Sequence, residues 1–187
     1  LRESGFEPRP IWDQAELMTL TDDADFMASC RCLVSAGGDG TLNGVVNRQL
    51  ALPIAMYPLG NENLFAKELR QPRDPKRLVD MIAAGHTTKI DLGRADKMRF
   101  TIVTSAGFDG DVANRLAQWR DRGTHLKRVG RSTYAKPVLA SMWAYDFPVM
   151  IVRADDRVLH GALVMVFNMG QYGLNLPLLA DADCRDG

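Results

Sequence analysis

Apolar residues in the first half of the chain form short continuous runs that alternate with runs at helical spacing. The segments 30–35 and 53–57 are short and apolar, which predicts buried strands. Each is followed by a glycine-containing turn, and then by apolar residues three or four positions apart. A strand, a turn and a helix repeated in this way favour parallel strands with helices between them.

Capping residues mark the ends of the predicted helices. Asp13 and Thr41 each stand directly before helical spacing, where a side-chain oxygen accepts a backbone hydrogen bond. Asp74 is followed by Pro75, and proline favours the first helical position. Gly85 predicts the end of this helix, because glycine adopts the left-handed conformation that commonly terminates helices.

After this glycine the pattern changes to runs rich in Ile, Val, Phe and Thr, which predict strands. The runs are 87–92, 99–105, 148–154 and 158–168. Asp155 and Asp156 lie between the last two runs and predict a hairpin turn there. The second half of the chain is therefore expected to be richer in β-structure than the first.

Helical spacing recurs twice among these strands, at 112–119 and 134–143. The second stretch carries a large apolar stripe, which more often indicates core than ligand contact. The stripe consists of Tyr134, Leu139, Met142 and Trp143. We therefore predict an α/β lobe with a parallel sheet at residues 1–88. A β-rich, sandwich-like lobe with helical insertions follows at residues 89–187.

Composition excludes several classes of protein. The 187 residues are enough for one medium domain or two small ones. Lys and Arg together number 23, as do Asp and Glu, so no basic field indicates nucleic-acid binding. No apolar run approaches the length that spans a bilayer, and no signal peptide opens the chain. We expect a cytoplasmic protein.

Cysteine and histidine residues give no metal-binding spacing. The cysteines are Cys30, Cys32 and Cys184, which form neither a disulfide framework nor a zinc pattern. We interpret Cys30 and Cys32 as small buried residues in a reducing compartment. The histidines are His86, His125 and His160, which are scattered and predicted to lie at the surface.

A glycine-rich turn between the first strand and its helix carries the candidate chemistry. It reads Gly37, Gly38, Asp39, Gly40, Thr41. Glycines let the backbone approach an anion, and a helix N-terminus contributes partial positive charge. An aspartate there needs a cation or a hydroxyl proton, and together these features indicate phosphoryl transfer. The spacing matches neither a Walker A loop nor a dinucleotide fingerprint, and Asp-Gly is also a hairpin-turn signal.

Four motifs follow one another along the chain, at 37–43, 58–66, 90–93 and 106–109. This ordered series resembles the diacylglycerol kinase catalytic domain family, which includes bacterial lipid kinases and sphingosine kinases. The resemblance covers nearly the whole chain. It implies a nucleotide-binding lobe similar to those of NAD kinase and phosphofructokinase, then a β-sandwich lobe, with a cleft between them. It also implies that a first strand and a C-terminal part are missing from this sequence.

The activity that the resemblance implies is transfer of the γ-phosphoryl group of ATP to a lipid hydroxyl, such as that of diacylglycerol or a sphingoid base. The implied cofactors are ATP and Mg²⁺. The implied nucleotide-binding residues are Gly37, Gly38, Asp39, Gly40, Thr41, Gly60, Asn61 and Asn63. Asp39 is the candidate catalytic residue, and Asp39 and Asp91 are the candidate metal ligands. We expect the two glycine loops to lie side by side at the carboxyl ends of neighbouring strands.

Each assignment has an alternative. In the alternative interpretation, Asp39 is a turn carboxylate that accepts hydrogen bonds from backbone N–H groups. Asn63 is then a plain helix cap, and Asp91 is a solvated acid at a strand end. Asp109 is better interpreted as the cap of the next helix than as a site residue. Asn61 stands where the family commonly has threonine, and it retains both donor and acceptor groups.

Leu64 occupies a position where many family members have an aspartate near the metal. Other members have leucine there, so activity is not excluded. The alternatives to a lipid kinase are an NAD kinase-like enzyme with a soluble substrate and a non-catalytic nucleotide-binding homologue. As a lipid kinase, the protein would meet its substrate peripherally, at the inner membrane surface. A homodimer is compatible with this interpretation.

Overall fold

The first half of the chain folds into helices around two strands. The computed structural model describes residues 1–121, 131–172, 176, 177, 179 and 181–186. The elements before residue 88 are η1 (Arg2–Ser4), α1 (Gln14–Thr21), α2 (Ala24–Ser29), β1 (Leu33–Gly37), α3 (Asp39–Val46), β2 (Ile54–Pro58), α4 (Leu64–Glu68) and α5 (Pro75–Ala84). The predicted helix ends are confirmed at Asp13 and Asp74, which accept backbone hydrogen bonds, and at left-handed Gly85.

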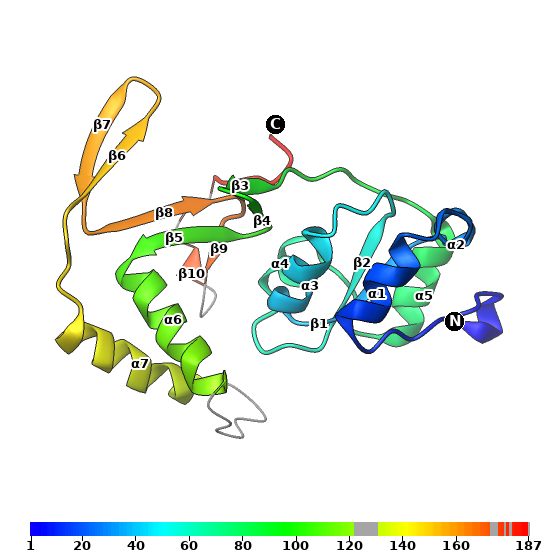
Figure 1. Cartoon of the computed structure of the whole chain (residues 1–187). Coiled ribbons are helices and arrows are strands. Elements are labelled where there is room, and N and C mark those ends of the chain that lie inside the picture. The colour runs from blue at the N-terminus through cyan, green and yellow to red at the C-terminus, as the bar shows by residue number, and fades with distance from the viewer. Residues whose placement is uncertain (122–130, 173–175, 178, 180, 187) are drawn as a thin grey trace.

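Strands β1 and β2 pair in parallel, as predicted, from Leu33 opposite Ile54 to Gly37 opposite Pro58. Alternate residues of β2 face opposite sides of this sheet. Met56 packs against residues of α3 and α4, whereas Ala55 packs against α5. Helices therefore cover both faces of the pair (Figure 1), which explains the continuously apolar sequence of β2.

The second half contains antiparallel pairs and two long helices. Its elements are β3 (Gly93–Ala95), β4 (Met98–Phe100), β5 (Val103–Gly107), α6 (Phe108–Asp121), α7 (Arg131–Ala144), β6 (Met150–Ala154), β7 (Arg157–Gly161), β8 (Leu163–Phe167), β9 (Gln171–Tyr172) and β10 (Leu176–Pro177). The pairs are β3–β4, β5–β8, β6–β7 and β9–β10. Asp155, with φ of 51°, forms the predicted turn of the β6–β7 hairpin, which projects from the rest of the molecule in Figure 1.

Three predicted strands have different bounds in the structure. The segment 87–92 is not a strand, and the run 99–105 divides into β4 and β5. Asn168 holds the chain at this division, because its side chain donates to the Thr101 carbonyl and its backbone N–H donates to Ile102. The run 158–168 divides into β7 and β8, since β8 leaves the hairpin and pairs with β5.

The larger core cluster draws residues from both sides of residue 88. It consists of Leu42, Val46, Met56, Leu64, Phe65, Ala66, Ile102, Met169 and Cys184. A hydrogen-bonded bridge reinforces the contact, because the Asn47 side chain donates to the Arg99 carbonyl and accepts from the Arg99 N–H, at 2.8 Å each. The division into lobes at residue 88 stays a prediction.

The apolar stripe on α7 is not core, contrary to the interpretation from sequence. Leu139 and Met142 are more than half exposed and Trp143 is 90% exposed, while the Tyr134 side chain lies outside the described part. The helical period was read correctly, but α7 packs on α6 through another face and leaves this stripe open. No helix in the described residues is long and apolar enough to cross a membrane.

Candidate nucleotide-binding site

The two glycine loops lie side by side, as predicted. They follow the paired carboxyl ends of β1 and β2, and the Leu59 N–H donates to the Gly37 carbonyl at 2.9 Å. A Cβ atom added to Gly60 would lie 2.4 Å from the Cα of Gly38. Only glycine permits this approach, so backbone from both loops forms one surface at the edge where open α/β sheets bind ligands.

Helix α3 begins one turn earlier than the sequence predicted. Its first residue is Asp39 and its N-cap is Gly38, which provides no side-chain hydrogen bond. Thr41 therefore lies inside the first turn, and the prediction that it caps the helix is wrong. Its hydroxyl lies over Gly37, where an added Cβ would be 2.4 Å from Oγ1. Uncapped N–H groups at this helix end remain available to an anion.

Asp39 connects the two loops. Its Oδ2 accepts a hydrogen bond from the Leu64 N–H and its Oδ1 accepts one from the Phe65 N–H, both at 3.1 Å. The carboxylate thus caps α4 from across the site. These two bonds use part of its acceptor capacity, which is about four lone-pair sites. Asp39 therefore accepts backbone hydrogen bonds, as the alternative interpretation predicted. Its remaining acceptor sites are left for a cation or a hydroxyl.

Asn63 shapes the second loop and does not cap α4 through its side chain. The side chain is 2% exposed, accepts from the Gly60 N–H at 2.9 Å and donates to the Gly60 carbonyl at 2.6 Å. Its backbone is left-handed, with φ of 50°, at the N-cap position. The plain-cap alternative is therefore wrong. Asn61 is exposed beside this closed loop.

Leu64 lies in the larger core cluster and is 8% exposed. Its side chain therefore faces away from solvent, where an aspartate would need compensation for its buried charge. In the described residues no three His, Cys, Asp or Glu side chains gather as a metal site. Mg²⁺ commonly uses only one or two carboxylates together with substrate phosphates, so the acceptor sites left on Asp39 fit such an ion.

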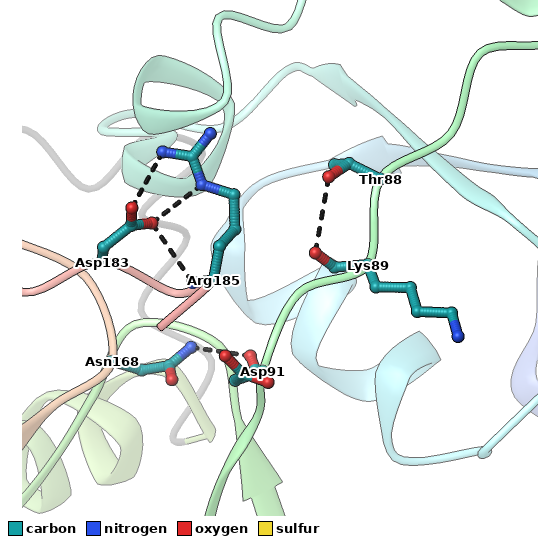
Figure 2. Close-up of polar contacts among 6 residues, drawn as sticks. All are labelled: Thr88, Lys89, Asp91, Asn168, Asp183 and Arg185. Carbon is teal, nitrogen blue, oxygen red and sulfur yellow. Dashed lines mark hydrogen bonds and ion pairs between the residues drawn. The ribbon is translucent and has the colours of Figure 1, made fainter. Parts of the chain in front are cut away.

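Asp91 lies in an irregular segment before β3 and not at a strand end. Its N–H donates to the Cys184 carbonyl at 2.6 Å, and its carbonyl accepts from the Asn168 side chain at 2.9 Å. Figure 2 shows Asn168 and Asp91 beside the Asp183–Arg185 ion pair. Hydrogen bonds from Arg185 hold the pKa of Asp183 below its ordinary value. These contacts fix the Asp91 backbone, and its role at the metal stays a prediction.

Asp109 is held by hydroxyl groups and is not the expected helix cap. It is the second residue of α6, and its carboxylate accepts hydrogen bonds from the Ser105 and Tyr172 hydroxyls. Tyr172 is distant in sequence, so no local pattern indicated this contact. His86 and His160 are exposed as predicted, and His125 falls outside the described residues.

Comparison with known proteins finds a matching family model for the first half of the chain. The family model for the diacylglycerol kinase catalytic domain matches residues 3–95. Over these residues, the chain is similar to the diacylglycerol kinase catalytic domain family. The matched part of the catalytic domain contains both glycine loops and Asp91.

Curated relatives carry the same name. A diacylglycerol kinase from Staphylococcus epidermidis is 39% identical over 79 residues, which cover 40% of this chain and 25% of that protein. One from Staphylococcus carnosus is 33% identical over 112 residues, which cover 57% of this chain and 37% of that protein. The alignment therefore spans only a part of these relatives.

Solved structures support the fold of the catalytic domain. A diacylglycerol kinase from Bacillus anthracis superimposes with a TM-score of 0.62 at 20% identity, covering 95% of this chain and 58% of the other. A second chain from the same organism gives a TM-score of 0.65 at 23% identity, covering 95% and 60%. The mixed α/β fold is confirmed. Its likeness to NAD kinase and phosphofructokinase stays a prediction.

Proposed function

We propose that this chain forms the nucleotide-binding part of a kinase that transfers the γ-phosphoryl group of ATP to a lipid hydroxyl. The observation that carries the proposal is the contact of Gly38 with Gly60 at the carboxyl ends of two neighbouring parallel strands. Ligands of open α/β sheets bind at such an edge. The match of residues 3–95 to the diacylglycerol kinase catalytic domain model supports the reaction class.

The roles of the residues follow from their geometry. Backbone N–H groups at the start of α3, with the Thr41 hydroxyl beside Gly37, would hold the nucleotide phosphates. Bound Mg²⁺ would neutralise charge that develops on the transferred group. Asp39 is the candidate ligand, since its carboxylate lies between the two loops. Positioning and charge neutralisation are sufficient for phosphoryl transfer, so no covalent intermediate is required.

A lipid acceptor is supported by exposed apolar side chains in the second half of the chain. On α7 they are Leu139, Met142 and Trp143; around β6, β7 and β8 they are Phe147, Val149, Ile151, Val158, Leu159, Leu163 and Val166. Scattered apolar residues at a surface are normal, but a group on neighbouring elements commonly marks an interaction site. Such a surface suits acyl chains better than a polar soluble acceptor.

The test is a kinase assay of the natural full-length protein with labelled ATP. Diacylglycerol and a sphingoid base are presented in mixed micelles, and NAD is the soluble comparison. We expect label in a lipid product that requires Mg²⁺. Transfer to NAD in place of lipid would overturn the acceptor assignment. A folded protein that binds ATP and labels none of these acceptors would overturn the proposed reaction.

A further inference from the structure

A cavity of about 260 Å³ lies beyond the other end of α3, away from the glycine loops. Gln49, Arg94, Lys97 and Arg99 line it. The three cations belong to the β3–β4 hairpin, and Gln49 follows the C-terminal end of α3. The eight residues of α3 span about 12 Å, so this hairpin cavity is separate from the candidate nucleotide site.

Local contacts fix the backbone that carries these cations. The Asn47 side chain makes two hydrogen bonds of 2.8 Å with the backbone of Arg99, which joins β4 to the end of α3. The Arg94 Nε donates to the Asp96 carbonyl at 2.8 Å, which orients that guanidinium at the hairpin turn. The backbone that carries these positive groups is therefore fixed by hydrogen bonds, unlike the backbone under scattered surface lysines.

Their charge is not compensated within the part of the chain that the structure describes. None of the three cations forms an ion pair there, and Asp96, on the same hairpin, does not line the cavity. Over the whole sequence 23 acidic residues balance 23 basic ones, so the excess at this hairpin is local. Concentrated positive charge around a hollow attracts anions.

We propose that the hairpin cavity binds a phosphate group. Guanidinium groups present forked donors that match phosphate oxygens, and Lys97 adds a point charge. The volume lies just below the roughly 300 Å³ at which small-molecule pockets begin, which suits one phosphorylated headgroup. The same chemistry occurs in a phospholipid headgroup and in a free phosphate ester. Met98, 57% exposed on the same hairpin, adds an apolar contact for the lipid case.

The test uses the natural full-length protein without turnover, so it is independent of the proposed kinase reaction. One arm titrates glycerol 3-phosphate by calorimetry, and the other measures sedimentation with phosphatidylglycerol–phosphatidylcholine vesicles against pure phosphatidylcholine. The variant combines Arg94→Gln, Lys97→Gln and Arg99→Gln. We expect at least about a tenfold loss of affinity, because the variant removes three charged hydrogen-bond donors from the cavity.

A matched control removes the same charges elsewhere. Arg73→Gln, Lys76→Gln and Arg77→Gln also replace two arginines and one lysine, at exposed positions beside or on α5. Single Lys97→Gln, an exposed position, serves if the triple hairpin variant unfolds, with a smaller loss in the same direction expected. Thermal unfolding by circular dichroism checks each variant.

The two arms separate the sources of phosphate. Hairpin-dependent binding of glycerol 3-phosphate alone identifies a free phosphate ester, and hairpin-dependent vesicle binding alone identifies a lipid headgroup; either supports the site. Binding of neither probe would overturn the proposal, as would an equal loss in the α5 control, which indicates net charge alone. An equal loss of ATP affinity in the hairpin variant would also overturn it, because the cations would then belong to the nucleotide site.

Discussion

Asp39 is the residue that joins the two loops of the candidate site. Its carboxylate accepts from two N–H groups of α4, although it lies 25 and 26 residues away in sequence. Asn63 closes its own loop on Gly60 and leaves the capping of α4 to Asp39. One carboxylate therefore contributes to stability and, under the proposed function, to the handling of Mg²⁺.

Asp39→Asn should lower kinase turnover by at least about a hundredfold, the lower range for lost acid–base assistance. It should also destabilise the fold by about 0.5–2 kcal/mol, because an amide has only one acceptor oxygen for two cross-loop bonds. Initial rates with labelled ATP and urea unfolding measure the two effects.

The control for this variant is Asp74→Asn. Asp74 caps α5 by accepting from the Arg77 N–H at 2.9 Å, away from the glycine loops. Asparagine keeps one acceptor oxygen for this single bond, so the control should lose little stability and keep its turnover. Unchanged turnover in a folded Asp39→Asn protein would contradict the catalytic assignment and leave Asp39 as a cap.

Gly60→Ala should weaken ATP binding by at least about tenfold and destabilise the protein by about 1–3 kcal/mol, the usual cost of overpacking. The new methyl group would meet Gly38 backbone at 2.4 Å, so the loops must separate. Gly110→Ala, in α6, is the control, because an added Cβ there meets only the Ser105 carbonyl oxygen, at 3.6 Å, and alanine favours the helix. Calorimetric titration measures the ATP affinity of both variants, and thermal unfolding measures their stability. Equal ATP affinity in the two variants would show that the contact between the loops is unimportant.

At the scale of elements, short units depend on contacts from elsewhere in the chain. Helix α4 has five residues, too few for independent stability, and is held by the Asp39 carboxylate and by its buried residues Leu64, Phe65 and Ala66. Helix α6 is longer and carries its own i,i+4 ion pair, with Arg115 Nε 2.6 Å from Asp111 Oδ2. These two helices should respond differently to loss of a charged partner.

The Asp111–Arg115 pair predicts a pH dependence. The Arg115 hydrogen bond lowers the pKa of Asp111 below its ordinary value of 3.8. A lowered folded pKa contributes stability that is complete above the unfolded pKa and is lost as the pH falls through the folded pKa. Arg115→Gln should therefore reduce stability at about pH 6 by only about 0.5 kcal/mol, because the pair is an i,i+4 helix pair that stays partly open to solvent. This difference should disappear near pH 2.

Urea unfolding at both pH values measures this difference. Arg153→Gln, which removes an exposed arginine from β6, controls for the loss of one positive charge. A difference between parent and Arg115→Gln that persists undiminished at the acidic pH would assign the effect to packing of the arginine and not to the ion pair.

At the scale of the whole molecule, the larger core cluster joins the two halves of the chain. Leu42, in α3, is 1% exposed and belongs to the same cluster as Ile102 and Met169. The Asn47–Arg99 bridge adds a polar link at the same boundary. The described residues therefore share one principal core across residue 88.

Leu42→Ala should destabilise the protein by about 2–5 kcal/mol, the range for a buried leucine replaced by alanine. Because the core is shared, β1, β2, β4 and β5 should lose protection together. Hydrogen exchange followed by mass spectrometry at increasing urea tests this, with exposed Leu139→Ala as the control. Loss of protection in β1 and β2 at a lower urea concentration than in β4 and β5 would show two independently folding units.

The sequence by itself determined the local features of this protein. The parallel strand–turn–helix repeat, the caps at Asp13 and Asp74, the left-handed Gly85 and the turn at Asp155 depend on residues close in the chain, where periodicity and backbone preference act. The ordered motifs likewise identified the family and placed both glycine loops at one sheet edge.

Only the tertiary structure decided which residues act on one another across the chain. Asp39 caps α4, Asn168 divides a predicted strand and Tyr172 holds Asp109 through partners that are distant in sequence. The exposure of Trp143 was decided in the same way, since a helical stripe shows which residues share a face but not which element covers it. Hydrogen bonds and packing between distant segments are therefore what turned two weak glycine motifs into one candidate site.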